Sequence, residues 1–509
     1  MKRKRTLLTA MLLAAAMLFT ACGSKPASDE PAVEARKDVS IGINADLATM
    51  DPQGALSLVE RQVHMQIYGT LLTYGENSST VPYLAESLDI SEDGLTWIFK
   101  LKQGVLFSNG EEMKADDVVF TFDRLAANPS FASVMGHLAS YTAPDDYTVE
   151  VKMNDPYMIF KHNLCDSQYS ILNRKAVEES GDDWSNPVGT GAYKLVEWAK
   201  GEKVVLAVNE NYTYGEMPSI ESISFKVVTD NNTMAVALQS GDIDMVAGTG
   251  VAASAVAQFE NNPDYTMLFS ATSQYDFFNL NTQKAPFNDI RVRQAIAHAV
   301  DKESIILMYA EGNGVAVNSQ LSDGVIGYDP SIKGYEYDVE KAKALLAEAG
   351  YADGFEMTVY TIGARIAICE ILQAQLSEIG ITMKCEAIDL GAFLGKIGAG
   401  EYDGNVMGLG LSYPEGECLL NPMFNSVSSF NWCGFTDPVL DECILGMQAS
   451  NDEAYRAECY STALKILEEN CPQIPLYYAR TNLAHDSRLN LPYVPTLGKF
   501  FVADMSWSA

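Results

Sequence analysis

The segment "VPYLAESLDISEDGLTWIFKLKQGVLFSNGEEMKADDVVFTFDRL", residues 81–125, contains a strand pattern, a turn and a helix pattern in succession. Leu95–Leu101 has the apolar alternation that is typical of a strand. Asn109 and Gly110 form a dipeptide that favours a tight hairpin turn. Residues 115–125 have helical spacing, and two aspartates stand near their start, where the helix dipole is positive. This order predicts a mixed α/β structure around the segment.

Strand and helix patterns alternate along most of the remaining chain. At 509 residues the chain exceeds what one hydrophobic core usually supports, so two or three domains are expected. Mixed elements with short connections predict an α/β architecture with mixed sheets. The expected strands cover residues 39–43, 147–153, 204–209, 220–228, 357–361 and 382–388, and the expected helices cover residues 56–72, 231–240, 289–300, 340–349, 365–379 and 453–469.

The N-terminus has the composition of an export signal. A basic head, residues 2–5, precedes an apolar run at residues 7–20 that is too short to span a bilayer as a helix. The run ends in "LFTAC", which resembles the lipobox of bacterial lipoproteins. We therefore expect residues 1–21 to be a removed signal peptide, Cys22 to carry the lipid, and residues 22–36 to form a flexible tether. A plain signal peptide with an incidental cysteine is the alternative.

The chain is strongly acidic, with a formal net charge of −32. Removal of the expected signal peptide takes away four cations and no anion and leaves −36. Nucleic-acid binding requires basic patches, so nucleic acid is not an expected partner. Net charge affects solubility and steering and does not identify a small-molecule ligand.

Eight cysteines remain after Cys22, and none of them forms a C-x-x-C pair. A zinc ribbon or a thioredoxin motif is therefore not expected. Because export permits disulfides, the even number is compatible with pairing, and buried thiols are an equal alternative. The sequence does not reveal a pairing. These cysteines are Cys165, Cys369, Cys385, Cys418, Cys433, Cys443, Cys459 and Cys471.

Motifs of the common catalytic sites do not occur in the sequence. It contains no G-x-S-x-G, no H-E-x-x-H, no full Walker A motif and no G-x-G-x-x-G. The nearest approach to a phosphate loop is "GAFLGK" at residues 391–396, which is one residue short. The five histidines are widely spaced, which disfavours a histidine metal site. We expect no catalytic residues, no bound metal and no cofactor.

The opening segment resembles the signature segment of extracellular solute-binding proteins of family 5, the peptide/nickel-type receptors of ABC importers. The likeness rests on an "AES" turn, on "DGLTW", on a "GVLFSNG" hairpin and on "ADDVVF". Other segments that resemble the family follow in the family's order, and this order is more specific than any single segment. They are "NPVGTGAYKL" at 186–195, "ALQSGDIDMV" at 237–246, "NTQKAPFNDIRVRQAIAHAVDKE" at 281–303, "DVEKAKALLAEAGY" at 338–351 and "LQAQLSEIGITM" at 372–383.

The resemblance implies a two-lobed, periplasmic-binding-protein-like fold of the α/β class with mixed sheets, a hinge cleft and an extra inserted domain. Two strands that cross between the lobes near Thr272 and Leu476 would form the hinge. The implied parts are lobe one (residues 37–81, 187–271 and 477–509), the extra domain (residues 82–186) and lobe two (residues 272–476).

The resemblance also implies a lipid-anchored receptor that captures a peptide or peptide-like solute by hinge closure and delivers it to a membrane permease. The permease and its ATPase would be separate chains. The receptor would be a monomer on the outer face of the cell membrane, or on the periplasmic side where two membranes are present. Nickel-chelate, opine and sugar receptors of the same fold, or a sensory lipoprotein, are the alternatives. The missing motifs disfavour an exported hydrolase.

The family's ligand site can be transferred to four places in this chain. One follows "MDPQ" in lobe one, and one is the strand that enters lobe two. A third is the start of a lobe-two helix, where Arg365 could grip a carboxylate with two hydrogen bonds. The fourth is the turn after the apolar stretch "MGLGL". The implied ligand-binding residues are Leu56, Ser57, Tyr275, Phe277, Asn279, Arg365, Leu411, Ser412, Tyr413 and Pro414.

The fourth place departs from the family's pattern. Peptide receptors of this family commonly read "ADY-x-x-P" there, and the aspartate pairs with the α-ammonium of the peptide. This chain reads "LSYPEG", so Ser412 occupies the aspartate position and supplies no charge. Glu415 and Glu417 are the nearest carboxylates that could compensate. The ligand therefore stays open among ordinary, N-blocked or modified peptides, opines, sugars and chelated metals.

Overall fold

The computed structural model describes residues 36–75, 78–248, 250–491 and 499–508. The expected signal peptide, the lipidation at Cys22 and all of the tether except its last residue lie outside the described residues. Within the described ranges, no helix combines the length and the apolar composition that a bilayer crossing requires.

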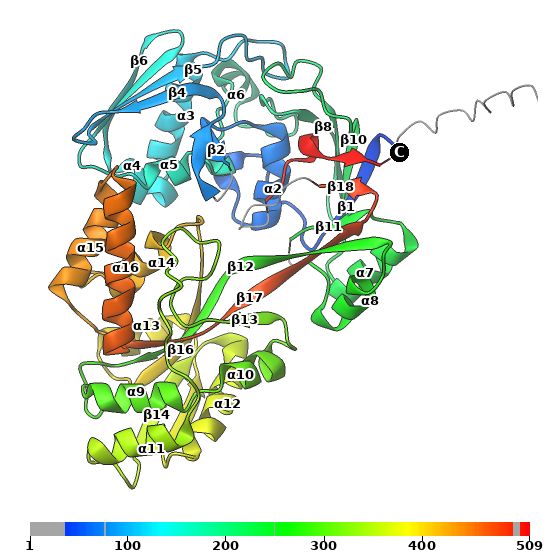
Figure 1. Cartoon of the computed structure of the whole chain (residues 1–509). Coiled ribbons are helices and arrows are strands. Elements are labelled where there is room, and N and C mark those ends of the chain that lie inside the picture. Colours follow the sequence, from blue (N-terminus) through cyan, green and yellow to red (C-terminus); the bar gives the residue numbers. More distant parts are fainter. Residues whose placement is uncertain (1–35, 76–77, 249, 492–498, 509) are drawn as a thin grey trace, which may run out of the picture.

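One large mixed sheet runs through the molecule (Figure 1). Its strands are β1 (Asp38–Ile43), β8 (Tyr193–Ala199), β9 (Lys203–Val208), β10 (Ser222–Val227), β11 (Met245–Val246), β12 (Tyr265–Leu280), β13 (Gly314–Ala316), β14 (Glu356–Thr361), β15 (Thr382–Ala387), β16 (Gly404–Gly410) and β17 (Gln473–Asp486). They follow the order β15–β14–β16–β12–β17–β11–β1–β10–β9–β8, and β13 also pairs with β17. Parallel and antiparallel pairs both occur, which confirms the predicted α/β class with mixed sheets.

Two long strands, β12 and β17, belong to both lobes. They pair antiparallel, and their register shifts between Ala271 and Tyr275, close to the crossing predicted near Thr272. In lobe one, β17 pairs with β11, and in lobe two β12 pairs with β16. Figure 1 shows the two strands running diagonally between the upper and lower halves of the molecule. A two-stranded ribbon therefore joins the two halves of the sheet.

Lobe one is built on strands β1 and β8–β11. The alternation predicted for β1 is present, and its side chains Val39, Ile41 and Ile43 are buried in a core that also contains Phe225 of β10. The associated elements are α2 (Leu58–Ile67), α7 (Asn231–Ser240), α8 (Val256–Glu260), β18 (Leu489–Asn490) and β19 (Ser506–Trp507).

Helix α2 is shorter than the sequence predicts. The prediction continues the helix to residue 72, but α2 ends at Ile67, and residues 72–74 form the short strand β2 (Leu72–Tyr74), which pairs with β3 (Thr80–Pro82). The predicted end is wrong because Leu71 and Leu72 are buried in the core of the extra domain instead of continuing the face of α2. Packing on a neighbouring domain thus overrides the local helical spacing.

The opening segment folds into the extra domain, which has a separate antiparallel sheet of order β4–β5–β7–β6 with β4 (Ala85–Ile90), β5 (Thr96–Leu101), β6 (Leu138–Asp145) and β7 (Thr148–Met153). Its helices are α3 (Ala115–Ala127), α4 (Ala132–Met135), α5 (Phe160–Asn163) and α6 (Arg174–Ser180). The predicted strand and helix of the segment correspond to β5 and α3. Trp97, Phe99 and Phe122 fill the core between them. Asp117, in the first turn of α3, accepts the N–H of Lys114 at 2.9 Å.

Lobe two combines β14, β15 and β16 with helices on its surface (Figure 1). The helix predicted over residues 365–379 corresponds to α12, and its expected apolar face is buried through Ile368, Leu372 and Leu376. The helices are α9 (Ile290–His298), α10 (Lys302–Tyr309), α11 (Val339–Glu348), α12 (Ile366–Ser377), α13 (Leu390–Gly398), α14 (Glu417–Phe424), α15 (Pro438–Ala449) and α16 (Glu453–Asn470).

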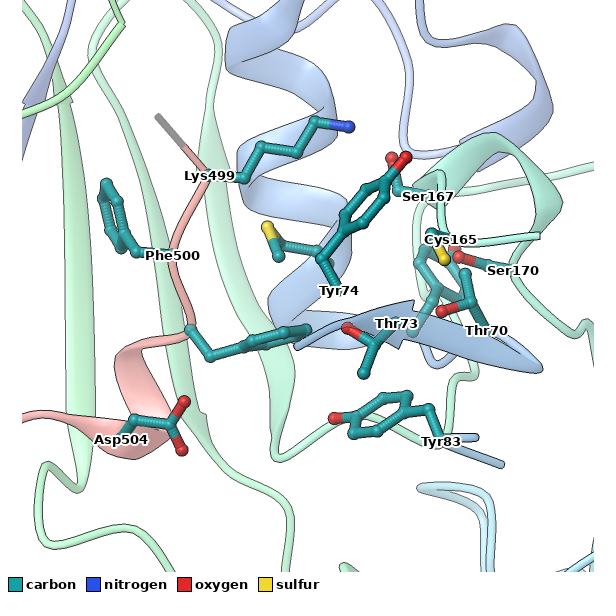
Figure 2. Close-up of a pocket in the computed structure, with 13 residues that line it drawn as sticks. Thr70, Thr73, Tyr74, Tyr83, Cys165, Ser167, Ser170, Lys499, Phe500 and Asp504 are labelled. Carbon is teal, nitrogen blue, oxygen red and sulfur yellow. The ribbon is translucent and has the colours of Figure 1, made fainter. Parts of the chain in front are cut away.

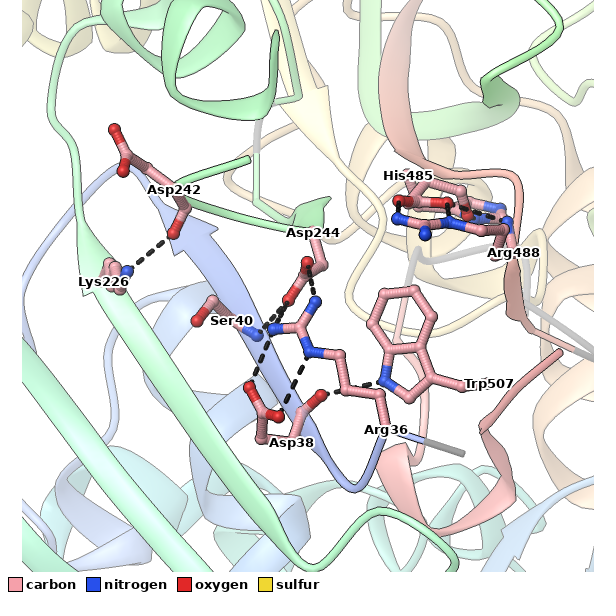
Figure 3. A network of polar contacts seen from close by, with 10 residues as sticks. Arg36, Asp38, Ser40, Lys226, Asp242, Asp244, His485, Arg488 and Trp507 are labelled. Atoms are coloured by element: carbon pink, nitrogen blue, oxygen red, sulfur yellow. Dashed lines mark hydrogen bonds and ion pairs between the residues drawn. The ribbon is translucent and has the colours of Figure 1, made fainter. Parts of the chain in front are cut away.

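An ion-pair network in lobe one links three segments that are distant in the sequence (Figure 3). Arg36 bonds both Asp38 and the buried Asp244, and the Asp244 carboxylate also accepts the backbone N–H of Ser40 at 2.7 Å. The guanidinium of Arg36 lies 4.7 Å from the ring centroid of Trp507, whose indole N–H donates to the Asp38 carbonyl at 2.8 Å. These contacts fasten the first strand to the segment before β11 and to the C-terminal segment.

Replacing Asp244 by alanine is expected to lower the free energy of unfolding by about 2 kcal/mol, because Arg36 and the Ser40 N–H would lose their shared acceptor. Asp242→Ala is the matched control, since Asp242 is exposed and stands two residues away. Urea unfolding followed by circular dichroism measures both variants. Equal unfolding midpoints for the two variants would contradict the role given to Asp244.

Candidate functional site

The turn between β16 and α14 presents one polar side chain to solvent. Leu411 and Pro414 are buried, Tyr413 is half-buried, and Ser412 is exposed. The Pro414 carbonyl accepts the N–H of Ile326 at 2.9 Å, which anchors the turn to a neighbouring loop. Of the four predicted residues in this turn, Ser412 is therefore the most accessible.

Glu417, one of the two carboxylates that could compensate for Ser412, already has protein partners. It accepts from the Tyr413 hydroxyl at 2.5 Å and from the side-chain amide of Gln448 at 2.6 Å. Burial raises the pKa of Glu417 above its usual value, although both hydrogen bonds oppose this. The Tyr413 hydroxyl is thereby committed to Glu417.

Glu415 is shared between lobe two and the extra domain. Its side chain is 0% exposed. Arg456 and the Tyr460 hydroxyl, both on α16, contact one carboxylate oxygen, the hydroxyl at 2.5 Å. Nε2 of His162, on α5, lies 2.5 Å from the other oxygen. Both carboxylates near Ser412 are therefore held by protein groups, and neither takes the place of the missing aspartate.

His162 is enclosed by aromatic rings at the same boundary. Its ring stacks on Tyr413 of lobe two at a centroid distance of 5.3 Å and on Tyr74 of β2 at 5.9 Å. Burial and the positive charge of Arg456 lower the pKa of His162 to about 3. The neutral ring donates from Nε2 to Glu415, and its Nδ1 is buried without a hydrogen-bond partner in the described part of the chain.

Arg365 lies directly before α12, as predicted, and its guanidinium already has a partner. It pairs with Asp276, a buried carboxylate on β12. The amide oxygen of Gln274, in the orientation that satisfies its neighbours, accepts from Nη2 of Arg365 at 3.0 Å. Burial raises the pKa of Asp276, and the positive charge of Arg365 opposes this rise. The Arg365 side chain is 22% exposed, so part of it remains accessible.

A glycine in β16 makes room for this ion pair. Gly408 lies opposite Asp276 in the sheet. A Cβ atom at Gly408 would lie 2.2 Å from a carboxylate oxygen of Asp276 and 2.3 Å from a guanidinium nitrogen of Arg365. Any side chain there would displace the pair. The first glycine of "MGLGL" thus leaves room for Arg365 beside the strand that leads to Ser412.

The three predicted residues of β12 lie in the core of lobe two. Tyr275, Phe277 and Asn279 are all buried. The Tyr275 hydroxyl donates to Gln473 at 2.8 Å, and the Gln473 amide donates to Asn279 at 2.9 Å. This placement differs from the expected contact role because β12 is an interior strand between β16 and β17, and its side chains here are covered. These residues are part of the buried interior of lobe two, and Asp276, which alternates with them along β12, is the residue that contacts Arg365.

The two predicted residues of lobe one have different environments. The Leu56 side chain is 87% exposed. Ser57 caps α2: its hydroxyl accepts the N–H of Glu60 at 3.2 Å, and the Glu60 carboxylate accepts the N–H of Ser57 at 2.9 Å. Within the described chain, no hydrogen bond of Leu56 or Ser57 reaches lobe two. Leu56 is accessible for contact, and Ser57 fixes the loop that presents it.

A cavity of about 500 Å³ lies where the extra domain meets lobe two. Its walls come from the α5 region, from residues 326–330 and from α16. Across the same boundary, the backbone N–H of Met158 donates to the Gln448 carbonyl at 2.6 Å, and Figure 1 shows α5 next to the upper ends of α15 and α16. No sequence motif indicates this cavity, because His162 and Glu415 in its walls are 253 positions apart.

A smaller cavity of about 100 Å³ lies between lobe one and the extra domain, beside β2 and the C-terminal residues 499–504 (Figure 2). Lys499 extends past Tyr74 and pairs with Asp166 at 2.9 Å. The hydroxyls of Ser167 and Ser170 are buried without partners among the described residues. Buried hydroxyls of this kind usually bind ordered water.

Metal-binding and cysteine chemistry add nothing to either cavity. Across the described ranges, no group of three or more His, Cys, Asp and Glu side chains is arranged to hold a metal ion. All eight cysteines in those ranges are free thiols, which corresponds to the second of the two alternatives for them.

Replacing Arg365 by alanine is expected to lower the free energy of unfolding at neutral pH by about 3 kcal/mol, because Asp276 would remain as an unpaired buried carboxylate. The pKa of Asp276, already raised by burial, would rise further. A raised folded-state pKa costs stability as the pH rises past the unfolded value, so the loss should grow from about pH 4 to pH 7 and be small below that range.

Adding Asp276→Asn to Arg365→Ala should restore most of this stability, because the second change removes the stranded charge. Urea unfolding at both ends of the pH range measures the single and double variants. A loss that does not depend on pH, or a double variant no more stable than the single one, would show that the pair does not carry the effect.

Sequence comparison relates nearly the whole chain to known proteins. The family model described as "Bacterial extracellular solute-binding proteins, family 5 Middle" matches residues 79–431. The glutathione-binding protein GsiB of Salmonella typhimurium (strain LT2) is 27% identical over 472 residues, which cover 89% of this chain and 91% of GsiB.

Solved structures lead to the same assignment. HbpA2 from Haemophilus parasuis aligns with a TM-score of 0.86 and 26% identity, over 93% of this chain and 100% of that chain. The periplasmic binding protein DppA from Helicobacter pylori, in complex with the peptide STSA, aligns with a TM-score of 0.72 and 28% identity, over 94% and 99%. These alignments confirm the predicted two-lobed, periplasmic-binding-protein-like fold. The chain belongs to the bacterial extracellular solute-binding proteins of family 5.

Proposed function

We propose that the mature protein is a lipid-anchored receptor that captures a peptide or peptide-like solute between its lobes and delivers it to an ABC permease. The observation that carries this proposal is the β12–β17 ribbon, which joins two lobes in a member of a solute-binding family. GsiB is described as glutathione-binding, and DppA is in complex with a peptide. Both descriptions favour a peptide-like solute for this chain.

The ribbon is suited to act as the hinge. Its register shifts between Ala271 and Tyr275, so the hydrogen-bond ladder is interrupted where the chain passes from lobe one to lobe two. Each lobe also has a hydrophobic core of its own, so the lobes can rotate as units. A solute that contacts both lobes binds the closed arrangement more tightly and shifts the population toward it.

The proposed contact surface combines Leu56 of lobe one with Arg365 and Ser412 of lobe two. The accessible part of Arg365 suits a carboxylate, because a guanidinium can donate two parallel hydrogen bonds. Ser412 offers no charge, and Glu415 and Glu417 are occupied by protein partners. We therefore favour a solute that does not depend on a free α-ammonium, such as an N-blocked or modified peptide.

A sugar is the second candidate, and Ser412 is the observation that favours it; an opine with a charged amine gains nothing from Ser412. A serine hydroxyl donates and accepts hydrogen bonds, which suits neutral polar groups better than a cation. A nickel chelate and a sensory role have no comparable observation in their favour.

The proposed partners are a permease and an ATPase on separate chains, with the receptor acting as a monomer. We place the receptor on the outer face of the cell membrane, held by a lipid on Cys22. Two acyl chains on one cysteine provide stable anchoring where a single chain would not.

Isothermal titration calorimetry with trialanine and N-acetyl-trialanine tests the proposed solute class. We expect the two peptides to bind with Kd values within about threefold of each other, because there is no carboxylate at position 412 to pair with a free amine. Ser412→Asp should then favour trialanine by about tenfold. Ser133→Asp, at an exposed position of the extra domain, is the control and should not change the ratio.

A strong preference of the wild-type protein for trialanine would contradict the claim that the uncharged Ser412 makes a free amine unimportant for binding. If trialanine, its acetylated form and glutathione all fail to bind while a sugar binds, the second candidate replaces the first. If none of these probes binds, the peptide-like solute class proposed here is rejected.

Cys22→Ser is expected to move the protein from the membrane fraction to the soluble exported fraction, because the lipid would have no attachment site. Cell fractionation followed by immunoblotting measures this. Ser24→Ala, two residues away, is the control and should leave the protein at the membrane. A serine variant that stays in the membrane fraction would exclude Cys22 as the anchor.

A further inference from the structure

The cavity between the extra domain and lobe two contains a lysine whose charge the protein does not neutralise. Nζ of Lys161 donates to the neutral side chain of Asn451 at 2.9 Å. No carboxylate of the described residues lies within ion-pair distance of it. Burial and the neighbouring positive charge of Arg456 both lower the pKa of Lys161. An anion in the cavity would stabilise this ammonium.

Arg456 supplies a second cation to the same cavity from α16. Its Nη2 pairs with Glu415, and its Nε donates to the Met447 carbonyl at 2.9 Å. Nη1, the remaining guanidinium nitrogen, has no hydrogen-bond partner in the described part of the chain. Arg456 has one buried carboxylate, Glu415, as its partner, and Lys161 has none among the described residues, so this wall carries an excess of positive charge.

The more exposed part of the lining is acidic. Glu453, in the first turn of α16, is exposed, and Asp329 is half-exposed in the loop that faces this helix. The negative charge of Glu453 favours the charged form of Lys161. The cavity therefore combines partly buried positive charge with more accessible negative charge, and this arrangement complements a molecule that carries both.

We propose that this cavity is a second binding site, for a small zwitterion of amino-acid to dipeptide size. The carboxylate of the ligand lies between Lys161 and Arg456, and its ammonium group faces Glu453. A volume of about 500 Å³ is within the range of small-molecule sites. The site shares no residue with the surface around Arg365 and Ser412, and it does not depend on the function proposed for that surface.

A ligand in this position connects two parts of the molecule. Lys161 belongs to the extra domain and Arg456 to lobe two, and the Glu415–His162 contact crosses the same boundary. The ligand makes both ionic contacts only while these parts lie together. Its binding therefore favours the arrangement in which the extra domain touches lobe two.

Isothermal titration calorimetry of the full mature chain with glycylglycine tests this site. We expect Lys161→Gln to weaken binding by about tenfold or more, because glutamine preserves a polar side chain without the charge. Lys175→Gln, at an exposed lysine of the same domain, should leave the Kd unchanged. N-acetylglycylglycine and glycylglycinamide each lack one charge and should bind more weakly than glycylglycine by about tenfold.

Glu453→Gln gives an independent readout, because Glu453 is exposed and its replacement leaves the buried network intact. This variant should lose most of the preference for glycylglycine over its acetylated form, since the ammonium group would lose its partner. A preference equal to that of the wild type would contradict the assigned orientation.

The Arg365→Ala/Asp276→Asn variant separates this site from the proposed solute site. Glycylglycine binding should persist in that variant. Binding that disappears there but survives in Lys161→Gln would belong to the Arg365 surface and would overturn the proposal for the cavity alone. An unchanged Kd in Lys161→Gln, or no glycylglycine binding to the wild type, would also overturn it.

Discussion

The β12–β17 ribbon is the constraint on which the two-lobed structure depends. Both strands are interior at their lobe-two end, where Tyr275 of β12 stacks on Tyr478 of β17 at a centroid distance of 5.1 Å. Those rings are fully buried, so this end of the ribbon cannot bend without breaking the core of lobe two. The irregular pairing between Ala271 and Tyr275 is the nearest point at which the ladder is already interrupted. If the ribbon is the hinge, as proposed, we expect bending to be concentrated there.

Buried carboxylates determine the chemistry near the lobe boundary. A charge removed from water requires a partner, and each acid near the end of β16 has one in the structure. Asp276 holds Arg365, Glu417 holds Tyr413, and Glu415 holds both Arg456 and His162. These acids therefore organise the walls around a possible ligand. The polar groups that remain accessible to a ligand are the partly exposed Arg365, Ser412, and the two cations Lys161 and Arg456.

Sequence patterns predict the helices and strands that depend on local spacing. They do not predict element ends that are set by packing against residues far away in the sequence. The strand and helix of residues 81–125, and the buried face of α12, depend on alternation and helical spacing, and both appear as β5, α3 and α12. The end of α2 is not predictable in this way, because Leu72 packs in the core of the extra domain. The site is less predictable still. Arg365 is a prediction from the family's pattern, and its pairing with Asp276, 89 positions away, could not be predicted from sequence.

The serine at position 412 leaves this part of the surface without a negative charge, and no neighbouring carboxylate supplies one. An ammonium group enclosed next to Ser412 would be removed from water without a counter-charge, because the neighbouring carboxylates are engaged inside the protein. The favourable charge–charge interaction between an aspartate and a free amine is absent there. Under the proposed function, discrimination among solutes would then rest on the carboxylate contact with Arg365 and on shape, and not on a charge at position 412.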